Sequence, residues 1–209
     1  DVRFVLFEML GFDKINRFEH FSSFDKDVFE DTLNLAEKIA VAQFYASNAE
    51  GDKVGLTYDP KTYEVKVPEA YHAGYKAFVD AGFHSLALPA EEGGMGMPMT
   101  LSFSCLEYFN AGNTSLCMYG SSLSGTARLL MNFGSDDIKK KYLPKMLEGK
   151  WGGTMCLTEP SAGSDVGALK TKAIRQPDGS YLISGQKIFI TYGDHDMVEN
   201  VIHPVLARI

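Results

Sequence analysis

Cysteines, basic residues and long apolar runs are all scarce in this 209-residue sequence. Three cysteines, Cys105, Cys117 and Cys156, are an odd number without metal-site spacing, which predicts reduced thiols in a reducing compartment rather than a disulfide framework. The 20 basic residues are outnumbered by 27 acidic ones, giving a net charge of -7, which argues against a broad nucleic-acid surface. No uninterrupted apolar run has the length of a membrane span.

Histidine is also rare, and no metal site is expected. His195 stands between Asp194 and Asp196, and we interpret it as a hydrogen-bonded residue of a polar turn. The other four histidines show no ligand spacing. A hydrophobic content of 45% with 22% charged residues is typical of a globular chain, and its acidity does not exclude a small anionic ligand, which needs only local donors.

Helical periodicity dominates the first 150 residues. A long helix is expected from Ser22 or Ser23, with Gly51 as a plausible end. Two adjacent apolar rows predict a wide buried stripe on it: Phe24, Val28, Leu35, Ile39 and Ala42 in one, and Phe29, Leu33, Ala36, Ala40 and Phe44 in the other. Further helices are expected over 68–82, 99–112, 114–133 and 135–149, with an extended segment at 83–89 and a glycine-rich connector at 91–98.

The pattern changes at Trp151, where strand-like segments begin. Strands are expected over 151–157, 169–175 and 181–191, and a fourth begins at Val201. The fold class is therefore α+β, an all-α helical domain followed by a β-sheet or barrel domain. We divide the chain into an N-terminal arm (1–21), a helical domain (22–150) and a β domain (151–209) that is incomplete at its C-terminus, and we expect a fragment of a longer polypeptide.

Two short motifs lie in the strand-rich part. Residues 155 to 165 read MCLTEPSAGSD, in which an apolar run ends at Thr158 and Pro160 stops the strand, leaving backbone N–H groups unpaired at its end. Such a loop suits a polar or anionic ligand. Residues 185 to 191 read GQKIFIT. Together the two motifs resemble the flavin-binding signature of the acyl-CoA dehydrogenases, in the family's order and spacing.

The likeness extends from about Phe24 to Ile209, and the tail from Gly193 to Arg208, with the N-terminal arm, is similar to the larger branch that includes the 3-methylmercaptopropionyl-CoA dehydrogenases. It implies FAD as cofactor, held by five residues: Met155, Leu157, Thr158, Phe189 and Thr191. The family usually has an aromatic residue where Met155 stands and often tryptophan where Phe189 stands; both replacements keep an apolar wall for the flavin ring.

The same resemblance implies a substrate site. Ser164, after Gly163, matches the serine that contacts the CoA moiety, while Ser161 replaces a common glycine. The helices Leu101 to Asn110 and Leu116 to Leu130 would line the acyl slot. Its depth would depend on three residues, Met99, Phe103 and Tyr119, together with residues outside this sequence.

The implied reaction is α,β-oxidation of an acyl-CoA thioester to its 2-enoyl-CoA, part of fatty acid metabolism, with hydride transfer to FAD. It requires a carboxylate base, which the family places in a C-terminal helical domain, so the base is expected beyond Ile209 and no catalytic residue is assigned here. Glu159 and Glu107 are interpreted as structural. Alone, the chain is expected to be inactive.

The family also implies a homo-oligomer and an electron acceptor such as an electron-transfer flavoprotein. The reducing compartment expected from the cysteines would be the cytoplasm or, in a eukaryote, the mitochondrial matrix. Two other classes stay open. One is a related flavoprotein acting as an oxidase or as a non-catalytic binding protein, which the residue at the base position would distinguish. The other is a helical interaction module without a cofactor, which requires the paired motifs to be coincidence.

Overall fold

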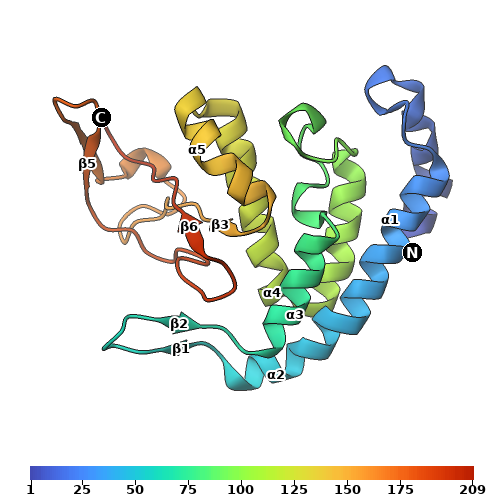
Figure 1. The fold of residues 1–209 in the computed structure, drawn as a ribbon, viewed down its shortest axis with the longest axis horizontal. Coiled ribbons are helices and arrows are strands. Elements are labelled where there is room, and N and C mark those ends of the chain that lie inside the picture. The colour runs from blue at the N-terminus through green and yellow to red at the C-terminus, as the bar shows by residue number, and fades with distance from the viewer.

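The computed structural model describes residues 1–209, with helices gathered on one side and short strands on the other (Figure 1). The α-helices are α1 Lys26–Ile39, α2 Ala46–Val54, α3 Ala70–Asp80, α4 Met99–Phe133 and α5 Asp136–Leu147. The strands are β1 Thr57–Tyr58, β2 Val65–Lys66, β3 Trp151–Gly153, β4 Lys172–Arg175, β5 Tyr181–Ser184 and β6 Asn200–Ile202. This helix-rich chain with a small partial sheet agrees with the predicted α+β class.

The N-terminal arm forms a π-helical turn at Phe4–Met9 and two 3₁₀ turns at Phe12–Arg17 and Glu19–Phe21. Leu6 and Phe12 from this arm are buried in the main apolar core. The N-terminal arm is therefore helical in short turns and packs against the main core.

The first long helix begins and ends later than predicted. Asp25 caps α1, because its carboxylate accepts a hydrogen bond from the Val28 N–H, so the start is not at the predicted serines. Helical structure continues through a π-helical turn and α2 to Val54, and Gly55 ends it with a φ of 68°. Gly51 lies inside α2, where a Cβ would stand 2.3 Å from the Tyr71 ring. Gly51 therefore serves close packing rather than helix termination.

Only one of the two predicted apolar rows is buried. All five residues of the row from Phe29 to Phe44 are at most 4% exposed. In the other row, Leu35 is 43% exposed and no member is fully buried. In that row only Phe24 and Ile39 pack partly against the core, so the prediction of a wide buried stripe was wrong.

The predicted boundary between helices 99–112 and 114–133 is confirmed inside α4. Asn113 alone leaves helical geometry, with φ -160° and ψ 96°. Its side-chain oxygen accepts a hydrogen bond from the Leu116 N–H at 3.0 Å, and its amide nitrogen donates to the Ser47 hydroxyl at 3.2 Å. Asn113 thus caps the second half of α4 and ties the bend to α2.

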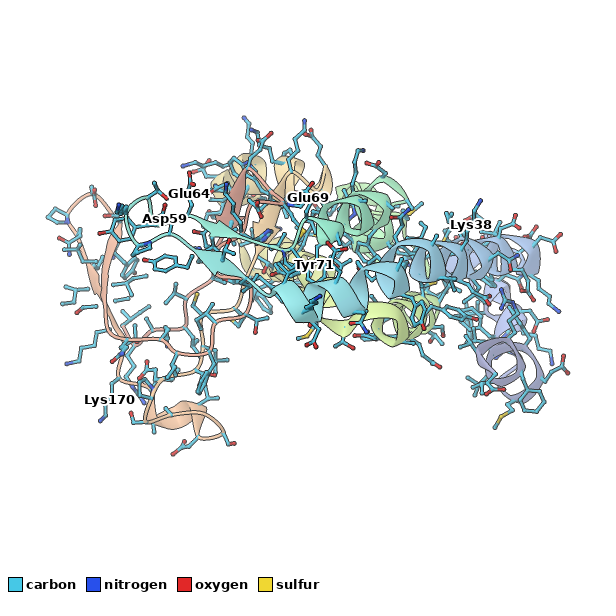
Figure 2. All side chains as sticks on the ribbon, turned by 90° about the horizontal axis from the view of Figure 1, so that it is seen from below. Lys38, Asp59, Glu64, Glu69, Tyr71 and Lys170 are labelled. Atoms are coloured by element: carbon cyan, nitrogen blue, oxygen red, sulfur yellow. The ribbon has the colours of Figure 1, made fainter.

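The strands are shorter than the sequence suggests. β3 pairs with β6 in parallel, β4 with β5 antiparallel, and β1 with β2 antiparallel in a hairpin that projects from the helices. Figure 2 shows that hairpin, with Asp59 and Glu64, reaching from the helices toward the side of the molecule that carries Lys170. The segment at 83–89 is not extended as predicted but begins with the 3₁₀ turn Phe83–Ser85. No helix has both the length and the apolar character needed to cross a membrane.

Candidate functional site

The first motif leaves one edge of its backbone open. Cys156 pairs with the C-terminal segment: its N–H donates to the Pro204 carbonyl at 2.9 Å, and its carbonyl accepts from the Leu206 N–H at 3.1 Å. The N–H groups of Leu157 and Thr158 make no hydrogen bond to another protein atom. Adjacent residues of an extended chain point their N–H groups to opposite sides, so the Leu157 N–H points away from the paired segment. Both N–H groups are unpaired, as the proline-terminated run predicted.

The second motif lies directly beside the first. The Ile188 N–H donates to the Thr158 carbonyl at 2.9 Å, and the Lys187 ammonium donates to the Leu157 carbonyl at 2.9 Å. The fold therefore brings together two segments that are about thirty residues apart in the chain.

Phe189 and Met155 offer apolar surface at this junction. Phe189 is 84% exposed and Met155 45% exposed. The backbone of Phe189 has a φ of 58° and that of Tyr192 a φ of 62°, a region that residues with a Cβ adopt only at a cost of about 1–3 kcal/mol. Strain stored around Thr191 is typical of functional loops.

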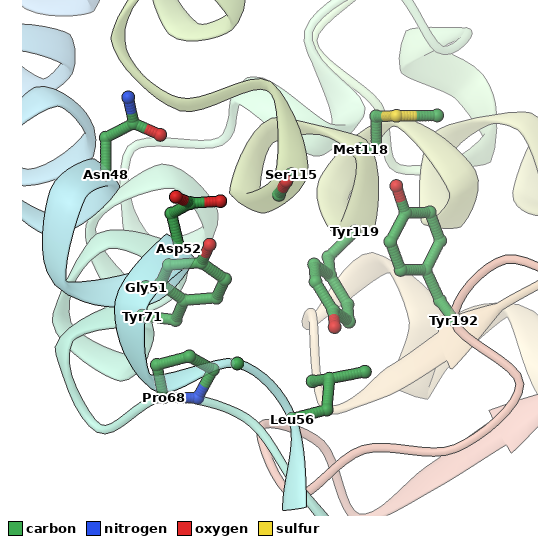
Figure 3. A pocket seen from close by; sticks show the side chains of 11 residues that line it. Asn48, Gly51, Asp52, Leu56, Pro68, Tyr71, Ser115, Met118, Tyr119 and Tyr192 are labelled. Carbon is green, nitrogen blue, oxygen red and sulfur yellow. The ribbon is translucent and has the colours of Figure 1, made fainter.

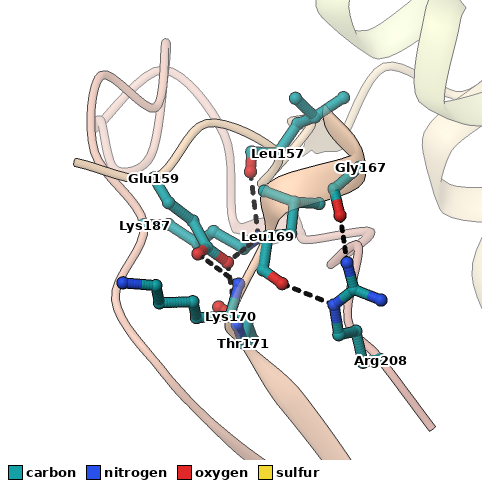
Figure 4. Close-up of polar contacts among 8 residues, drawn as sticks. All are labelled: Leu157, Glu159, Gly167, Leu169, Lys170, Thr171, Lys187 and Arg208. Atoms are coloured by element: carbon teal, nitrogen blue, oxygen red, sulfur yellow. Dashed lines mark hydrogen bonds and ion pairs between the residues drawn. The ribbon is translucent and has the colours of Figure 1, made fainter. Parts of the chain in front are cut away.

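Glu159 organises the loop between the motifs (Figure 4). Its side chain is 4% exposed, lies 3.0 Å from the Lys187 ammonium, and accepts N–H bonds from Lys170 and Thr171 at 2.6 and 2.9 Å. The Thr171 side chain, then these N–H groups and Lys187, lower the pKa of Glu159 to about 2. Although the Thr171 hydroxyl contributes most to this shift, its geometry falls short of a hydrogen bond.

This arrangement keeps Glu159 ionised and fully engaged by donors at physiological pH. A general base needs a pKa nearer neutrality and access to substrate. Glu159 is therefore structural, as the sequence indicated. Glu107 lies exposed on α4 and forms no ion pair, which agrees with its interpretation as part of a helix face.

The predicted CoA-contacting residues lie on the exposed part of the same loop. Gly163 and Ser164 are both exposed, and a Cβ at Gly163 would meet nothing within 4 Å. The Ser164 hydroxyl makes no hydrogen bond to another protein atom. The position leaves room for a ligand, and the assignment of these two residues stays a prediction.

The turn after the second motif is fastened to the helices. The Val67 N–H donates to the Asp196 carboxylate at 2.9 Å, and His72 lies 3.6 Å from the same carboxylate. His195 is 6% exposed, and its ring lies 4.8 Å from that of Tyr119, centroid to centroid. The polar turn was predicted with a hydrogen-bonded histidine, but the buried Nδ1 of His195 has no partner. Burial lowers its pKa to about 4, so this histidine is neutral.

Two cavities lie near the predicted acyl slot. Met99 and Phe103 line an apolar cavity of about 310 Å³ between the two halves of α4 and the 83–88 turn. Tyr119 lines a different cavity of about 360 Å³ with Tyr71, Tyr192 and Asp52 (Figure 3). The three residues predicted to set slot depth therefore do not share one cavity.

Sequence reasoning missed the Lys187 to Glu159 ion pair and the roles of Tyr192 and Asp196. Lys187 lies inside the second motif, but Glu159 is 28 residues away in the chain, so no local pattern could have revealed the pair.

The chain matches two protein-family models. Residues 57–150 match the N-terminal domain of acyl-CoA dehydrogenases, and residues 154–202 match their middle domain. Over its full length the chain is 40% identical to a broad-specificity linear acyl-CoA dehydrogenase, FadE5, from Mycobacterium tuberculosis. It is also 36% identical over its full length to a 3-methylmercaptopropionyl-CoA dehydrogenase from Ruegeria pomeroyi.

The fold has counterparts among solved structures. Butyryl-CoA dehydrogenase from Megasphaera elsdenii superposes on 80% of this chain and 42% of its own, with a TM-score of 0.65 and 27% identity. The chain spans about a third of the length of its two relatives, 34% of the Mycobacterium protein and 35% of the Ruegeria protein.

Proposed function

This chain belongs to the acyl-CoA dehydrogenase family, and we propose that it supplies part of an FAD site in an enzyme that oxidises acyl-CoA thioesters to 2-enoyl-CoA esters. The proposal includes an acyl-CoA substrate, an electron acceptor such as an electron-transfer flavoprotein, and a homo-oligomeric enzyme. It also includes the division into arm, helical domain and β domain at residues 21 and 150.

Five residues would hold the cofactor: Met155, Leu157, Thr158, Phe189 and Thr191. The observation that carries this proposal is the open backbone edge at Leu157 and Thr158, whose N–H donors have no protein partner and adjoin the second motif. A flavin edge presents carbonyl oxygens and ring nitrogens that need such donors, and the exposed Phe189 ring supplies an apolar wall. The residues present therefore fit the group.

When bound, FAD would supply the hydride acceptor of the reaction. The chain's own residues bind and orient it. Glu159 and Lys187 hold the two motifs together, since Lys187 bonds the Leu157 carbonyl and Glu159 bonds Lys187. Gly163 and Ser164 would contact the CoA moiety from the exposed end of the loop. The general base would come from outside this sequence, so residues 1–209 are expected to be inactive alone.

The test is the visible absorption spectrum of the full-length protein, recorded without oxygen before and after acyl-CoA esters are added. We expect a flavin band that bleaches with at least one ester. The variant Thr158→Val should weaken flavin binding, with Thr154→Val as a buried control on the same chain segment. A protein purified without flavin, and unable to bind added FAD, would contradict the cofactor assignment.

An unbleached flavin band would instead favour the non-catalytic alternative. A band that bleaches with an ester and returns at once on admitting oxygen, with release of hydrogen peroxide, would favour the oxidase.

A further inference from the structure

The apolar cavity of Met99 and Phe103 contains a cation that has no anionic partner. Its walls come from both halves of α4 and from the turn at 83–88, and Arg128 is the only arginine, lysine, aspartate or glutamate among its lining residues. The Arg128 side chain is partly buried and donates one hydrogen bond, to the Ala87 carbonyl at 2.7 Å. None of the ion pairs of the chain includes Arg128. A cation drawn into an apolar cavity normally has an anionic partner, because removing it from water is costly.

The other polar groups of this cavity carry no charge and are largely engaged within the protein. The hydroxyls of Ser121 and Ser124 each donate to the backbone carbonyl four residues earlier, both at 3.1 Å. His84 uses its Nε2–H on the Leu147 carbonyl at 2.8 Å, and burial lowers its pKa, so its ring is neutral. Most N–H donors of Arg128, by contrast, have no partner in the protein.

One face of α4 leads from the second motif to Arg128. It holds residues spaced three or four apart, which therefore lie on the same side of the helix: Met118, Ser121, Gly125 and Arg128. Met118 also lines the neighbouring cavity together with Tyr192, the residue that follows the second motif (Figure 3). At 1.5 Å per residue, the row from Met118 to Arg128 is about 15 Å long.

The middle of this row is open. Gly125 has no side chain, and a Cβ built on it would meet nothing within 4 Å. The opposite wall is formed by the longer apolar side chains of Met99 and Phe103, which are 41% and 65% exposed. An alkyl chain therefore has room to lie along the row, with small residues on one side and apolar side chains on the other.

Resting on the proposed function, we propose that this row holds a long acyl group whose far end carries a carboxylate, and that Arg128 binds that carboxylate. The thioester end lies at the Met118 end of the row, beside the residues proposed to hold the flavin. A guanidinium presents its N–H donors in a planar fork that matches a carboxylate. Because the row is about 15 Å long, a short dicarboxylic acyl group does not reach Arg128.

The experiment compares acyl-CoA esters of matched chain length with the full-length enzyme: dodecanoyl-CoA with dodecanedioyl-CoA, and hexanoyl-CoA with adipoyl-CoA. We expect kcat/KM for dodecanedioyl-CoA to exceed that for dodecanoyl-CoA at least about tenfold, as a hydrogen bond between charged groups allows. Adipoyl-CoA should show no advantage over hexanoyl-CoA, because its carboxylate ends short of Arg128.

Variants of Arg128 test its role through the ratio of kcat/KM for dodecanedioyl-CoA to that for dodecanoyl-CoA. Arg128→Met should lower this ratio to about one or less, whereas Arg128→Lys keeps the charge without the fork and should retain part of the preference. The control Lys140→Met removes an exposed cation on α5 and should leave the ratio unchanged. An arginine that only held the Ala87 carbonyl would affect both esters equally.

A further variant tests the route of the acyl chain and does not depend on Arg128. Gly125→Leu fills the open middle of the row and should lower kcat/KM for both dodecanoyl-CoA and dodecanedioyl-CoA at least about tenfold, while butyryl-CoA is unaffected. Asn132→Leu, which adds the same side chain at an exposed position of the same helix, should leave all three esters unaffected.

Two results would overturn the inference while the proposed function stands: equal oxidation of the two long esters, or an unchanged ratio in Arg128→Met. Equal oxidation is the result expected if an acidic group from outside this sequence pairs with Arg128. If no ester is oxidised, the proposed function fails and takes the inference with it.

Discussion

The helical and strand-rich parts of this protein are stabilised by different means. Nearly all buried apolar residues belong to the first 150, in two clusters of 19 and 7. Beyond residue 150 the buried apolar residues are Ala162 and Leu169, whereas Thr154, Glu159, Thr171 and His195 are buried polar residues. Apolar burial fixes the helices, and polar contacts fix the geometry of the loops that carry both motifs.

This difference shows how the two motifs can keep a fixed geometry although they lie in a small and exposed part of the protein. The hairpin of β4 and β5 exposes Ile174, Leu182 and Ile183, so little apolar area is buried there. Directional contacts such as Lys187 to Glu159 have fixed lengths and partners, which apolar packing lacks. The four predictions below test the contrast, from the largest effect to the smallest.

The helical core should respond most strongly to loss of volume. Phe109 is fully buried, with ring centroids of Phe44, Phe78 and Phe83 each within 4.9 Å. Phe109→Ala should lower the free energy of unfolding by about 3–5 kcal/mol, measured by urea denaturation. The matched control Phe103→Ala, on the same helix but 65% exposed, should change it by less than about 0.5 kcal/mol. Equal losses would contradict the assignment of the core.

Glu159→Gln should have the second largest effect, confined to the strand-rich part. The change leaves the Lys187 ammonium without its carboxylate, so the thermal unfolding midpoint and flavin affinity should both fall at pH 7. Because the folded pKa is lowered to about 2, the stabilisation is complete above the ordinary pKa of 4.5 and is lost as pH falls toward 2. The difference in thermal unfolding midpoint between wild type and variant should therefore become smaller as the pH falls from 4.5 toward 2. A difference that stays constant over this range would contradict the ion pair's role.

His195 should make stability depend on pH in a higher window. Its folded pKa is lowered to about 4 from an ordinary 6.5, so the unfolded chain binds its proton first as pH falls. The contribution of neutral His195 to the free energy of unfolding should be fully present above pH 6.5. It should fall by about 3 kcal/mol as the pH drops to 4. His195→Phe keeps an aromatic ring beside Tyr119 and should remove that slope in denaturation curves. An unchanged slope would assign the titration to another group.

The smallest effect is expected where the turn is fastened to the helical part. Asp196→Ala leaves the Val67 N–H without an acceptor and should cost about 1–2 kcal/mol of unfolding free energy. Asp80→Ala, which breaks only the exposed pair with Lys76, should cost less than about 1 kcal/mol. Reversal of this order would show that the turn is held by its aromatic contacts instead.

Local signals predicted local features well. The pattern of apolar residues predicted two helices separated at Asn113, and the proline after Thr158 predicted the unpaired donors of the first motif. Predictions that depend on packing were less accurate. Gly51 does not end the helix but allows Tyr71 to pack closely against it, and only one apolar row of α1 is buried. Whether an apolar row is buried depends on which other elements pack against it, and the periodicity of the sequence carries no information about those elements.

The sequence by itself determined the α+β class, the family and the two motifs, because these depend on residue order within short stretches. The roles of Met155, Leu157, Thr158, Phe189, Thr191, Gly163 and Ser164 stay predictions. Only the tertiary structure decided that Glu159 is bound to Lys187, that Tyr119 and Tyr192 face one cavity, and that His195 is buried without a partner. Each of these joins residues distant in the chain, and such contacts exist only once burial has placed the elements together.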